Sequence, residues 1–512
     1  MLVKTFGAAL YGITATLVTL ELHISRGIQF LMVGLPDSAV KESQQRVKTA
    51  IEAIGFSWPG KAITINMAPA DVKKEGAAYD LAFAIGLLAA TEQIPVERVG
   101  KFLIMGELSL DGGIREIKGA LPMGILARDL KLDGIILPKK NAPEAAVVDG
   151  VKVFGFDHLE DVVNFFLDES SAEEVVLDTE QLFFSKLNEY SLDFRDVKGQ
   201  ENIKRAFEIA AAGGHNLILI GPPGAGKTML AKRLPTILPP LNLNESLETT
   251  KIHSVAGRVA KGEALVTSRP FRAPHHTISD VALVGGGSFP QPGEISLAHN
   301  GVLFLDELPE FKRTVLEVMR QPLEERMVTI SRARFSVDFP ASLMLVAAMN
   351  PCPCGFHNHP TKDCQCPSGT VQKYLNRVSG PLLDRIDIHI EVTPVSFDEL
   401  SAKPETEGSE VIRERVIKAR TLQEDRFEYT PQIHCNAQLG SKELKEYCGI
   451  DSQARDMLKN AMRKLSLSAR AYDRILKVSR TIADLDGSKN IKLFHLAEAI
   501  NYRSLDRENW AA

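Results

Sequence analysis

Apolar residues alternate with polar ones near the start of the chain and then recur at helical spacing. From Val18 to Ser25 every second residue is apolar, which predicts a half-buried strand. Asp37 then precedes a helical stretch with one apolar face, and Gly55 ends it. Short apolar runs predict further strands at Gly27–Val33, Ala62–Asn66, Phe102–Met105, Gly134–Leu137 and Lys152–Phe156, and helices at Tyr79–Ala90 and Gly119–Leu130. Residues 1–166 are therefore predicted to form an α/β unit.

The pattern changes after residue 166. Acidic residues crowd a stretch with little periodicity, which predicts a solvated acidic linker over residues 167–192. Residues 193–395 carry the motifs described below and are predicted to form an α/β core with a parallel sheet. After a polar break, residues 396–512 are predicted to form an α-helical lid. Its expected helices are Val411–Glu424, Ser441–Gly449, Ser452–Leu465, Arg470–Leu485 and Leu493–Tyr502.

Length, composition and charge narrow the class of protein. A chain of 512 residues holds two to four domains, and 44% hydrophobic with 24% charged residues is ordinary for a soluble globular protein. The net charge of −5 excludes a protein that is basic over its whole surface and coats nucleic acid. A local basic surface that lines a groove is still compatible with this charge. No apolar run approaches 18 residues and the N-terminus lacks a basic leader, so we expect a cytoplasmic protein without membrane contact.

A phosphate-binding loop follows an apolar run at residues 217–220. Its sequence is Gly221-Pro222-Pro223-Gly224-Ala225-Gly226-Lys227-Thr228. A buried strand leading into a glycine loop and then a helix directs free backbone N–H groups at phosphate. Lys227 is expected to reach the β- and γ-phosphates, and the Thr228 hydroxyl to bind Mg²⁺. This segment predicts binding of ATP or GTP.

Two later apolar runs end in polar residues suited to hydrolysis. Residues 301–305 lead into Asp306 and Glu307, which predicts Mg²⁺ binding through water by the first and polarisation of the attacking water by the second. Residues 343–349 lead into Asn350, which is expected to lie between the phosphate loop and the acidic strand and to orient the same water. Together with the loop, these residues predict a hydrolase.

Arginines near the end of the core and in the lid are candidates for sensing the γ-phosphate. Arg385 stands between two acids before an apolar strand, where ring-forming ATPases place an arginine that reaches the neighbouring subunit's nucleotide. Arg470 begins a lid helix and is expected to contact the γ-phosphate. Arg474, one turn later, is the rival candidate.

The stretch between Asp306 and Asn350 predicts a helix at Phe311–Glu325 and two strands at Met327–Ile330 and Phe335–Phe339. Their connection carries Arg332 and Arg334, which are expected to grip a nucleic-acid backbone; a solvated charged turn is the alternative. A second insertion at 279–299 is another candidate pore loop. His275 and His276 fit either a ligand role or a polar network.

Four of the six cysteines lie in one segment with the spacing C-x-C-x9-C-x-C. They are Cys352, Cys354, Cys364 and Cys366. Two close thiolate pairs separated by a loop suit one tetrahedral Zn²⁺, while disulfides are disfavoured in a reducing compartment. Iron–sulfur ligation is less favoured, and His357 or His359 could replace a thiolate. We predict a structural zinc site.

The combined motifs resemble the magnesium-chelatase-like AAA+ ATPases of the ComM/YifB type over essentially the whole chain. The most specific segments are those at 271–277, 292–299, 350–355 and 383–385. The resemblance implies a six-membered ring with ATP at the subunit interfaces. It also implies a motor that acts on single-stranded or branched DNA and drives branch migration of homologous strands in natural transformation.

The N-terminal unit resembles the Lon-type protease fold. The segment at 73–80 matches the region in which Lon carries its nucleophilic serine, but Ala78 occupies that position. The position of the partner lysine falls on Leu121, with Lys118 three residues away. Without the hydroxyl group, peptide cleavage has no obvious nucleophile, so we expect a proteolytically inactive domain.

The leading hypothesis is a hexameric, DNA-stimulated ATPase that uses ATP and Mg²⁺. Its rivals are the ATPase subunit of a metal chelatase, an ATP-dependent protease and a protein-remodelling ATPase. The nucleotide site does not separate a chelatase from a DNA motor because both share it. The cysteine segment and the Lon-like unit favour the DNA motor, and the missing serine argues against the protease.

Overall fold

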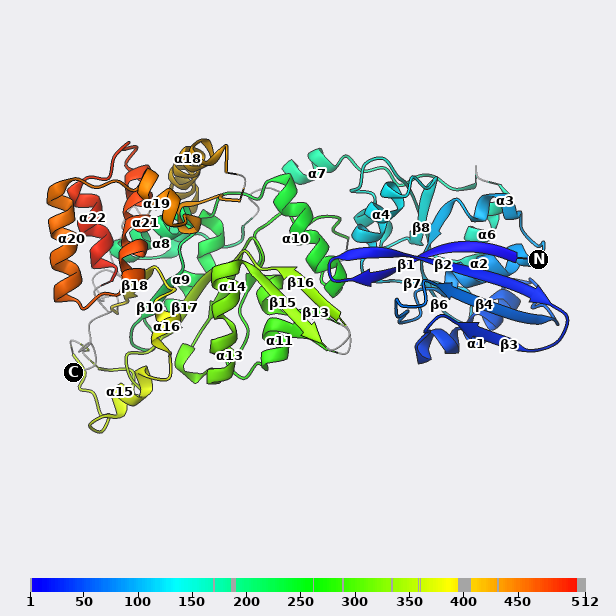
Figure 1. The fold of residues 1–512 in the computed structure, drawn as a ribbon, viewed down its shortest axis with the longest axis horizontal. Helices are drawn as coiled ribbons and strands as arrows, with labels where there is room; N and C mark the ends of the chain where they lie inside the picture. Colours follow the sequence, from blue (N-terminus) through cyan, green and yellow to red (C-terminus); the bar gives the residue numbers. More distant parts are fainter. Residues whose placement is uncertain are drawn as a thin grey trace. The chain divides into compact units, whose positions relative to one another are not determined.

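The computed structural model describes residues 2–168, 171–185, 190–260, 262–287, 290–332, 335–357, 359, 361–394, 407–430 and 432–503. The chain divides into two compact units (Figure 1). The first comprises Met1–Lys186, Asn242–Thr267 and Phe289–Pro292, and the second comprises Leu187–Leu241, Ser268–Ser288 and Gly293–Ala512. Residues 242–267 were predicted as part of the nucleotide-binding core, whereas they pack within the first unit. The other domain boundaries stay predictions.

A seven-stranded mixed sheet lies at the centre of the first unit, in the order β3-β4-β2-β1-β5-β8-β9. Its central strands are antiparallel, and the pairs at both edges are parallel. The strands are β1 (Leu2–Tyr11), β2 (Thr14–Ser25), β3 (Phe30–Val33), β4 (Ala62–Ala68), β5 (Phe102–Ile104), β8 (Gly134–Pro138) and β9 (Lys152–Phe156). A small hairpin is formed by β6 (Glu107–Leu108) and β7 (Ile114–Arg115).

All five strands expected in this unit after the first are found, and the alternating run at Val18–Ser25 lies in β2. The preceding strand β1 was not predicted. Its middle residues Gly7, Ala8 and Ala9 are small and consecutive, so they carry neither alternation nor a β-branched signal. Tertiary pairing with β2 over the whole strand stabilises it instead.

The predicted helices of the first unit are also confirmed. The Asp37 side chain accepts a hydrogen bond from the Val40 N–H at 2.8 Å and caps the first of them. The helices are α1 (Ser38–Ala53), α2 (Asp80–Ala90), α3 (Val96–Val99), α4 (Ala120–Asp129), α5 (Ala142–Ala145), α6 (Leu159–Leu167), α7 (Thr179–Ser185) and α10 (Leu243–Ala256). Helix α7 falls within the stretch expected to be a solvated acidic linker, and its Phe183 is buried.

A buried carboxylate explains why α10 packs in the first unit. Glu144 of α5 accepts hydrogen bonds from the Leu121 N–H at 2.8 Å and from the Ser254 hydroxyl of α10. Burial raises the pKa of Glu144, although these donors oppose the shift. Ala264 and Leu265 add apolar contacts with the first unit. The periodicity of residues 242–267 does not predict that they pack in the first unit, because the contact between Ser254 and Glu144 joins residues 110 positions apart.

A five-stranded sheet forms the core of the second unit, in the order β11-β14-β17-β10-β18. All of its neighbouring strands are parallel. The strands are β10 (Leu217–Ile220), β11 (Phe271–Arg272), β14 (Val302–Leu305), β17 (Met344–Met349) and β18 (Ile388–Glu391). The continuous apolar runs in the sequence reflect burial of both faces of this sheet. Its parallel direction brings the ends of β10, β14 and β17 to one edge.

The segment after β14 differs in part from its prediction. One helix was expected at Phe311–Glu325, whereas the chain forms η4 (Leu308–Glu310), α13 (Arg313–Val318) and α14 (Arg320–Glu325). Pro322 within the predicted helix lacks an N–H donor, which favours a break shortly before it. The following hairpin is confirmed as antiparallel β15 (Met327–Arg332) and β16 (Phe335–Pro340). In the 279–299 insertion, the structure has the short helices α11 (Asp280–Val284) and α12 (Glu294–Leu297).

The C-terminal part is helical, as predicted. Figure 1 shows these helices in brown to red, grouped beside the parallel sheet. They are α18 (Ser409–Phe427), α19 (Ser441–Tyr447), α20 (Ser452–Lys464), α21 (Ala469–Leu485) and α22 (Leu493–Asn501). Helices α18 and α21 pack on α8 (Glu201–Gly213), so the sheet and this region share one apolar core. Within the described ranges, no helix combines the length and apolar character that a bilayer span requires.

Candidate functional site: a nucleotide-binding edge and a cysteine cluster

The phosphate-binding loop has the backbone shape that its glycines allow. It connects β10 to α9 (Lys227–Arg233), with Gly224 and Gly226 at φ of +79° and +85°. L-residues with a side chain rarely adopt these angles. At Gly221, a Cβ atom would lie 2.3 Å from the Val392 carbonyl oxygen, so no larger residue fits there without moving the backbone. The loop therefore presents its N–H groups at the start of a helix.

Lys227 lies under the loop as a buried cation. Its Nζ donates hydrogen bonds to the carbonyls of Gly221 at 2.7 Å and Pro222 at 2.9 Å, and to Asn350 Oδ1 at 3.1 Å. Burial lowers the pKa of Lys227, and Asp306 and Glu307 oppose this effect. These contacts hold the ammonium group beside the loop and next to the end of β17.

The acidic strand meets the loop at the same edge. Asp306 follows β14, and its Oδ2 accepts a hydrogen bond from the Thr228 hydroxyl at 2.6 Å. Its other oxygen accepts the Glu307 N–H at 2.9 Å. Oxygen ligands of this kind are those that Mg²⁺ prefers. The structure thus brings Lys227, Thr228, Asp306 and Asn350 together, although 78 positions separate Thr228 from Asp306 and 123 separate Lys227 from Asn350.

Glu307 is placed by a strained backbone and by a histidine. Its φ is +54°, an unusual value for a residue with a side chain, and its side chain is 57% exposed. The Glu307 Oε2 atom lies 3.1 Å from His276 Nδ1. The His276 ring stacks on His275 with centroids 4.1 Å apart and meets the edge of Phe311. The sequence left the role of His276 open between a ligand and a polar network; the structure places it on Glu307.

The connection between His276 and Glu307 follows from the topology. β11 and β14 are parallel neighbours, and His276 lies in the segment after β11 while Glu307 follows β14. Both segments therefore leave the sheet at the same edge. The sequence indicated His276 as a candidate but not its partner, because a histidine after a two-residue strand does not show which acid it meets.

Arg385 lies at the opposite edge of the sheet. It precedes β18, whereas the phosphate loop follows the adjacent parallel strand β10. A four-residue strand separates the two edges by about 13 Å. The guanidinium is 8% exposed and pairs with Glu324 Oε1 at 2.5 Å, while the Pro381 carbonyl accepts a further hydrogen bond at 2.5 Å. Arg385 is therefore directed away from the nucleotide loop of its own chain.

The two lid candidates differ in their surroundings. Arg470 is exposed in the first turn of α21, after Ser468 caps that helix. Arg474 forms an ion pair with the buried Asp387 at 2.8 Å. Burial raises the pKa of Asp387, but Arg474 and His215 outweigh burial and hold it well below its usual range. The Arg470 side chain therefore lies at the surface, whereas the Arg474 side chain is engaged in an ion pair inside the fold.

The four clustered cysteines converge on one point. Cys352 is buried and the other three are half-buried, and the four sulfur atoms lie within 4.8 Å of one another. The Sγ–Sγ distances among Cys352, Cys354 and Cys364 are 3.3, 3.7 and 3.6 Å. A tetrahedral zinc with bonds of about 2.3 Å places its sulfurs roughly 3.8 Å apart. The donor set fits zinc.

Neither nearby histidine belongs to this donor set among the described residues. The His357 N–H donates to Cys352 Sγ at 3.3 Å, and the His359 ring accepts hydrogen bonds from the Thr361 and Lys362 N–H groups. The cluster also borders the phosphate loop. A Cβ atom on Gly355 would lie 2.4 Å from Pro223, so the cysteine segment and the loop are in close contact.

Some predicted residues receive no side-chain description. Arg334 lies outside the described residues, and Arg332 is described only as the last residue of β15. In the first unit, Ala78 occupies the position expected for a nucleophile, and Leu121 is fully buried with its N–H bound to Glu144. Lys118 is exposed and its chain lies against Gly257.

Comparison with known protein families identifies the same parts. Residues 193–400 match the model for magnesium chelatase, subunit ChlI; residues 20–141 match subunit ChlI of Mg-chelatase; and residues 406–503 match the C-terminal part of that subunit. Competence protein ComM of Haemophilus influenzae is 45% identical over 98% of this chain and 97% of its own length. An uncharacterized protein, YifB of Escherichia coli, is 44% identical over 98% and 96%.

The similarity to Lon is more limited. Lon protease 2 of Bacillus subtilis is 28% identical over 28% of this chain and 27% of its own length. This match supports the expected Lon-like part, and the parallel sheet with its helical C-terminal region supports the expected core and lid. The matched ATPase core carries the phosphate loop and the acidic strand that meet at one edge of the sheet. The chain belongs to the ComM/YifB family of magnesium-chelatase-like AAA+ ATPases.

Proposed function

We propose that the protein is a ring-forming ATPase that translocates on DNA and drives branch migration of homologous strands during natural transformation. The observation that carries this proposal is the 45% identity over nearly the full length to a protein named for competence. The ATPase part also has a physical basis in the convergence of Lys227, Thr228, Asp306 and Glu307 at one edge of the sheet.

Each residue of this edge has a role in the proposed reaction. Lys227 exchanges its bonds to the loop carbonyls for the phosphates of ATP, and Thr228 and Asp306 hold Mg²⁺. When bound, Mg²⁺ neutralises charge on the phosphates. Glu307 polarises the attacking water, and Asn350 orients it from the end of β17. Arg385 supplies positive charge to the γ-phosphate bound by the next subunit, because its own loop lies at the other edge of the sheet.

Oligomer formation follows from this arrangement as part of the proposal. A site that needs a loop from one chain and an arginine from another creates a head-to-tail interface, and such an interface forms a ring when the rotation between subunits closes. A six-membered ring matches the expectation for the family. Arg385 must leave Glu324 when it meets a neighbour's phosphate, so formation of the interface exchanges one acidic partner for another.

A branched DNA substrate tests the motor function. The full-length protein is incubated with ATP and a labelled four-way junction, and strand products are separated by electrophoresis. We expect product release that requires ATP and is lost in Glu307→Gln.

Substitution of both Arg332 and Arg334 by alanine is expected to lower the affinity for DNA. It should also make that affinity less dependent on salt concentration, since each phosphate contact steepens the fall of affinity with salt. Absence of DNA binding at moderate salt would contradict the proposal and favour a chelatase or a protein remodeller.

His276 offers a test of how Glu307 is held. We expect His276→Ala to lower kcat for ATP hydrolysis by about tenfold with little change in KM, because the base loses the group that orients it. Steady-state ATPase kinetics provide the measurement. His275→Ala is the matched control, since within the described residues its ring forms hydrogen bonds with Thr277, whereas His276 is the ring that pairs with Glu307. Equal losses in both variants would show a general disturbance of this loop.

The cysteine cluster is proposed to hold one structural Zn²⁺. We expect about one zinc per chain by elemental analysis, and a loss of most of it in Cys352→Ser. Because this segment touches the phosphate loop, ATP affinity is expected to fall as well. Cys448→Ser is the control, since Cys448 is buried outside the cluster and should leave zinc content unchanged. Full zinc retention in Cys352→Ser would contradict this site.

A further inference from the structure

A polar cavity of about 230 Å³ lies in the second unit, at the edge of the parallel sheet where the strands begin. Asn216, Leu343 and Asp387 line it, and each immediately precedes a strand (β10, β17 and β18). The phosphate loop, Asp306 and Asn350 all follow strands of the same sheet. The cavity is therefore separate from the nucleotide-binding edge described above.

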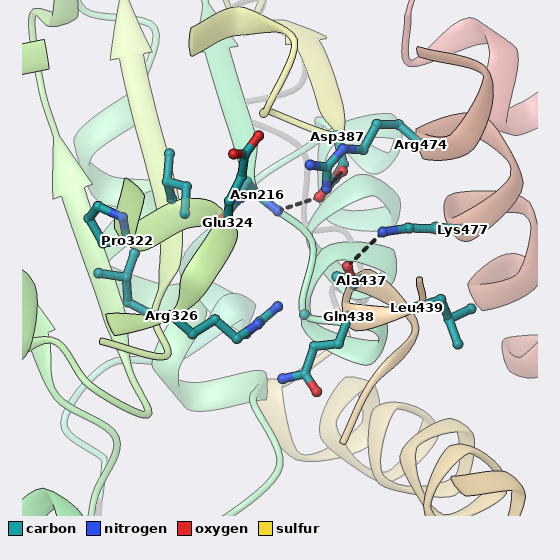
Figure 2. Close-up of a pocket in the computed structure, with 13 residues that line it drawn as sticks. Asn216, Pro322, Glu324, Arg326, Asp387, Ala437, Gln438, Leu439, Arg474 and Lys477 are labelled. Carbon is teal, nitrogen blue, oxygen red and sulfur yellow. Dashed lines mark hydrogen bonds and ion pairs between the residues drawn. The ribbon is translucent and has the colours of Figure 1, made fainter. Parts of the chain in front are cut away.

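Cations from two parts of the chain face this cavity. Figure 2 shows Arg326, which follows α14, and Lys477 of α21 extending toward one another across it, with Arg474 above Lys477. Gln438 contributes an amide from η5 (Asn436–Gln438). Such a volume far exceeds the roughly 10–15 Å³ that one buried water needs. It accommodates a small polyatomic ion together with water.

The acids at this cavity are already used by other cations. Asp387 pairs with Arg474 and accepts the Asn216 N–H at 3.0 Å, and Glu324 pairs with Arg385. Arg326 donates to the Ser342 hydroxyl at 3.1 Å, and Lys477 donates to the Ala437 carbonyl at 3.2 Å. Across the part of the chain that the structure describes, neither of these two cations forms an ion pair. Arg326 and Lys477 thus face the cavity without a carboxylate partner of their own, since the two acids that line it pair with Arg474 and Arg385.

The pKa values of both Lys477 and Arg326 are lowered in these surroundings. Burial and the neighbouring Arg474 lower the pKa of Lys477 to about 8, although Asp387 and Asp473 oppose the shift and Arg326 adds to it. Burial also lowers the pKa of Arg326. An anion between the two side chains would remove the repulsion and supply the missing hydrogen-bond acceptors.

We propose that the cavity bounded by Arg326, Gln438, Arg474 and Lys477 is a binding site for a phosphate-type oxyanion. Arg326 and Lys477 approach the anion from opposite sides, and Gln438 donates an amide hydrogen to it. The site joins the segment after α14 to α21, so its occupant stabilises the contact between the sheet and the C-terminal helices. This inference does not depend on the DNA motor.

The test uses sulfate as the probe, because sulfate keeps its double charge between pH 7 and 9. The full-length protein carries Lys227→Ala in every sample, which weakens the response of the phosphate loop. Thermal unfolding is followed as sulfate replaces chloride at constant ionic strength. We expect Lys477→Met to weaken the apparent sulfate affinity at least about tenfold, because it removes a charge-assisted hydrogen bond. Lys459→Met, which removes an exposed lysine from α20, should leave that affinity unchanged.

Lys477→Arg keeps the proposal testable if the methionine variant unfolds. With Lys477, sulfate affinity should fall as the pH rises from 7 to 9, since the lysine loses its proton through a pKa of about 8. An arginine stays charged in this range, so Lys477→Arg should bind sulfate with little pH dependence. Equal sulfate affinity in Lys477→Met and the parent, or no response to sulfate in the parent, would overturn the site.

Two sources of phosphate remain to be distinguished within the same experiment. A short single-stranded oligonucleotide is added in competition with sulfate. Competition that disappears in Lys477→Met identifies a phosphate of the DNA backbone. Lysine-dependent sulfate binding without such competition identifies free phosphate, for example the product of ATP hydrolysis. Both outcomes support an oxyanion site, whereas failure of the junction assay alone would contradict only the proposed motor.

Discussion

Glu307→Gln is expected to lower kcat for ATP hydrolysis by roughly 10²–10⁴-fold while ATP stays bound, because an amide cannot accept the proton of the attacking water. The substitution keeps the size and the positive-φ backbone position of the residue. It also leaves untouched the bonds of Lys227 and Thr228 that define the binding edge. Turnover is measured by phosphate release and affinity by titration with a fluorescent ATP analogue.

Glu310→Gln provides the matched control for this experiment. Glu310 lies three residues away in η4, carries the same side chain, and pairs with Arg377 at 3.0 Å. Its amide variant should retain nearly normal turnover. If Glu307→Gln hydrolyses ATP at a rate close to that of the parent, another group polarises the water and the proposed mechanism is wrong. A parallel loss of ATP binding would instead show that the substitution has disturbed the loop.

Arg385→Ala is expected to lower hydrolysis by about 10³–10⁵-fold with ATP affinity nearly intact, the effect of removing an arginine that acts in the transition state. In the proposed mechanism Arg385 acts on another chain because of its place in the sheet. Arg385 precedes β18, and the phosphate loop follows the neighbouring parallel strand β10. Glu324→Gln is the control, because it removes the acidic partner of Arg385 but leaves the arginine in place.

Mixing two inactive variants tests the shared site directly. Arg385→Ala retains the loop and Lys227→Ala retains the arginine, so a mixed interface can contain both intact groups. For equal amounts of the two proteins, about one interface in four is complete, and roughly a quarter of the parent activity should return if interfaces act independently. No recovery after subunit exchange, shown by labelled subunits in the same assemblies, would contradict an arginine supplied by the neighbour.

Residues 217–228, 301–307 and 343–350 could be predicted as parts of a nucleotide site because each begins with a continuous apolar strand that leads into its candidate residues. The backbone conformation of such a segment depends on its own glycines and apolar run. The cysteine cluster could be predicted for a similar reason, since its four thiols lie within one short segment. Even the candidate role of Arg385 came from its position before an apolar strand and not from any contact.

Other features depend on pairs of residues that no local pattern connects. His276 meets Glu307 only because β11 and β14 are parallel neighbours. Helix α10 joins the first unit through Ser254 and Glu144, which are 110 positions apart in sequence. The cavity that Arg326 and Lys477 line also depends on distant elements, and neither residue belongs to a sequence motif.

The sequence by itself determined which candidate groups this protein carries: a glycine loop suited to phosphate, acids suited to Mg²⁺ and water, and four clustered thiols suited to zinc. These follow from residue type and short spacing, which act within one element. Only the tertiary structure decided which edge of the sheet each group occupies, which histidine contacts Glu307, and where Arg326 and Lys477 face one cavity. Those features arise from packing between distant elements, and hydrophobic periodicity encodes the face that each element buries but not the partner it meets.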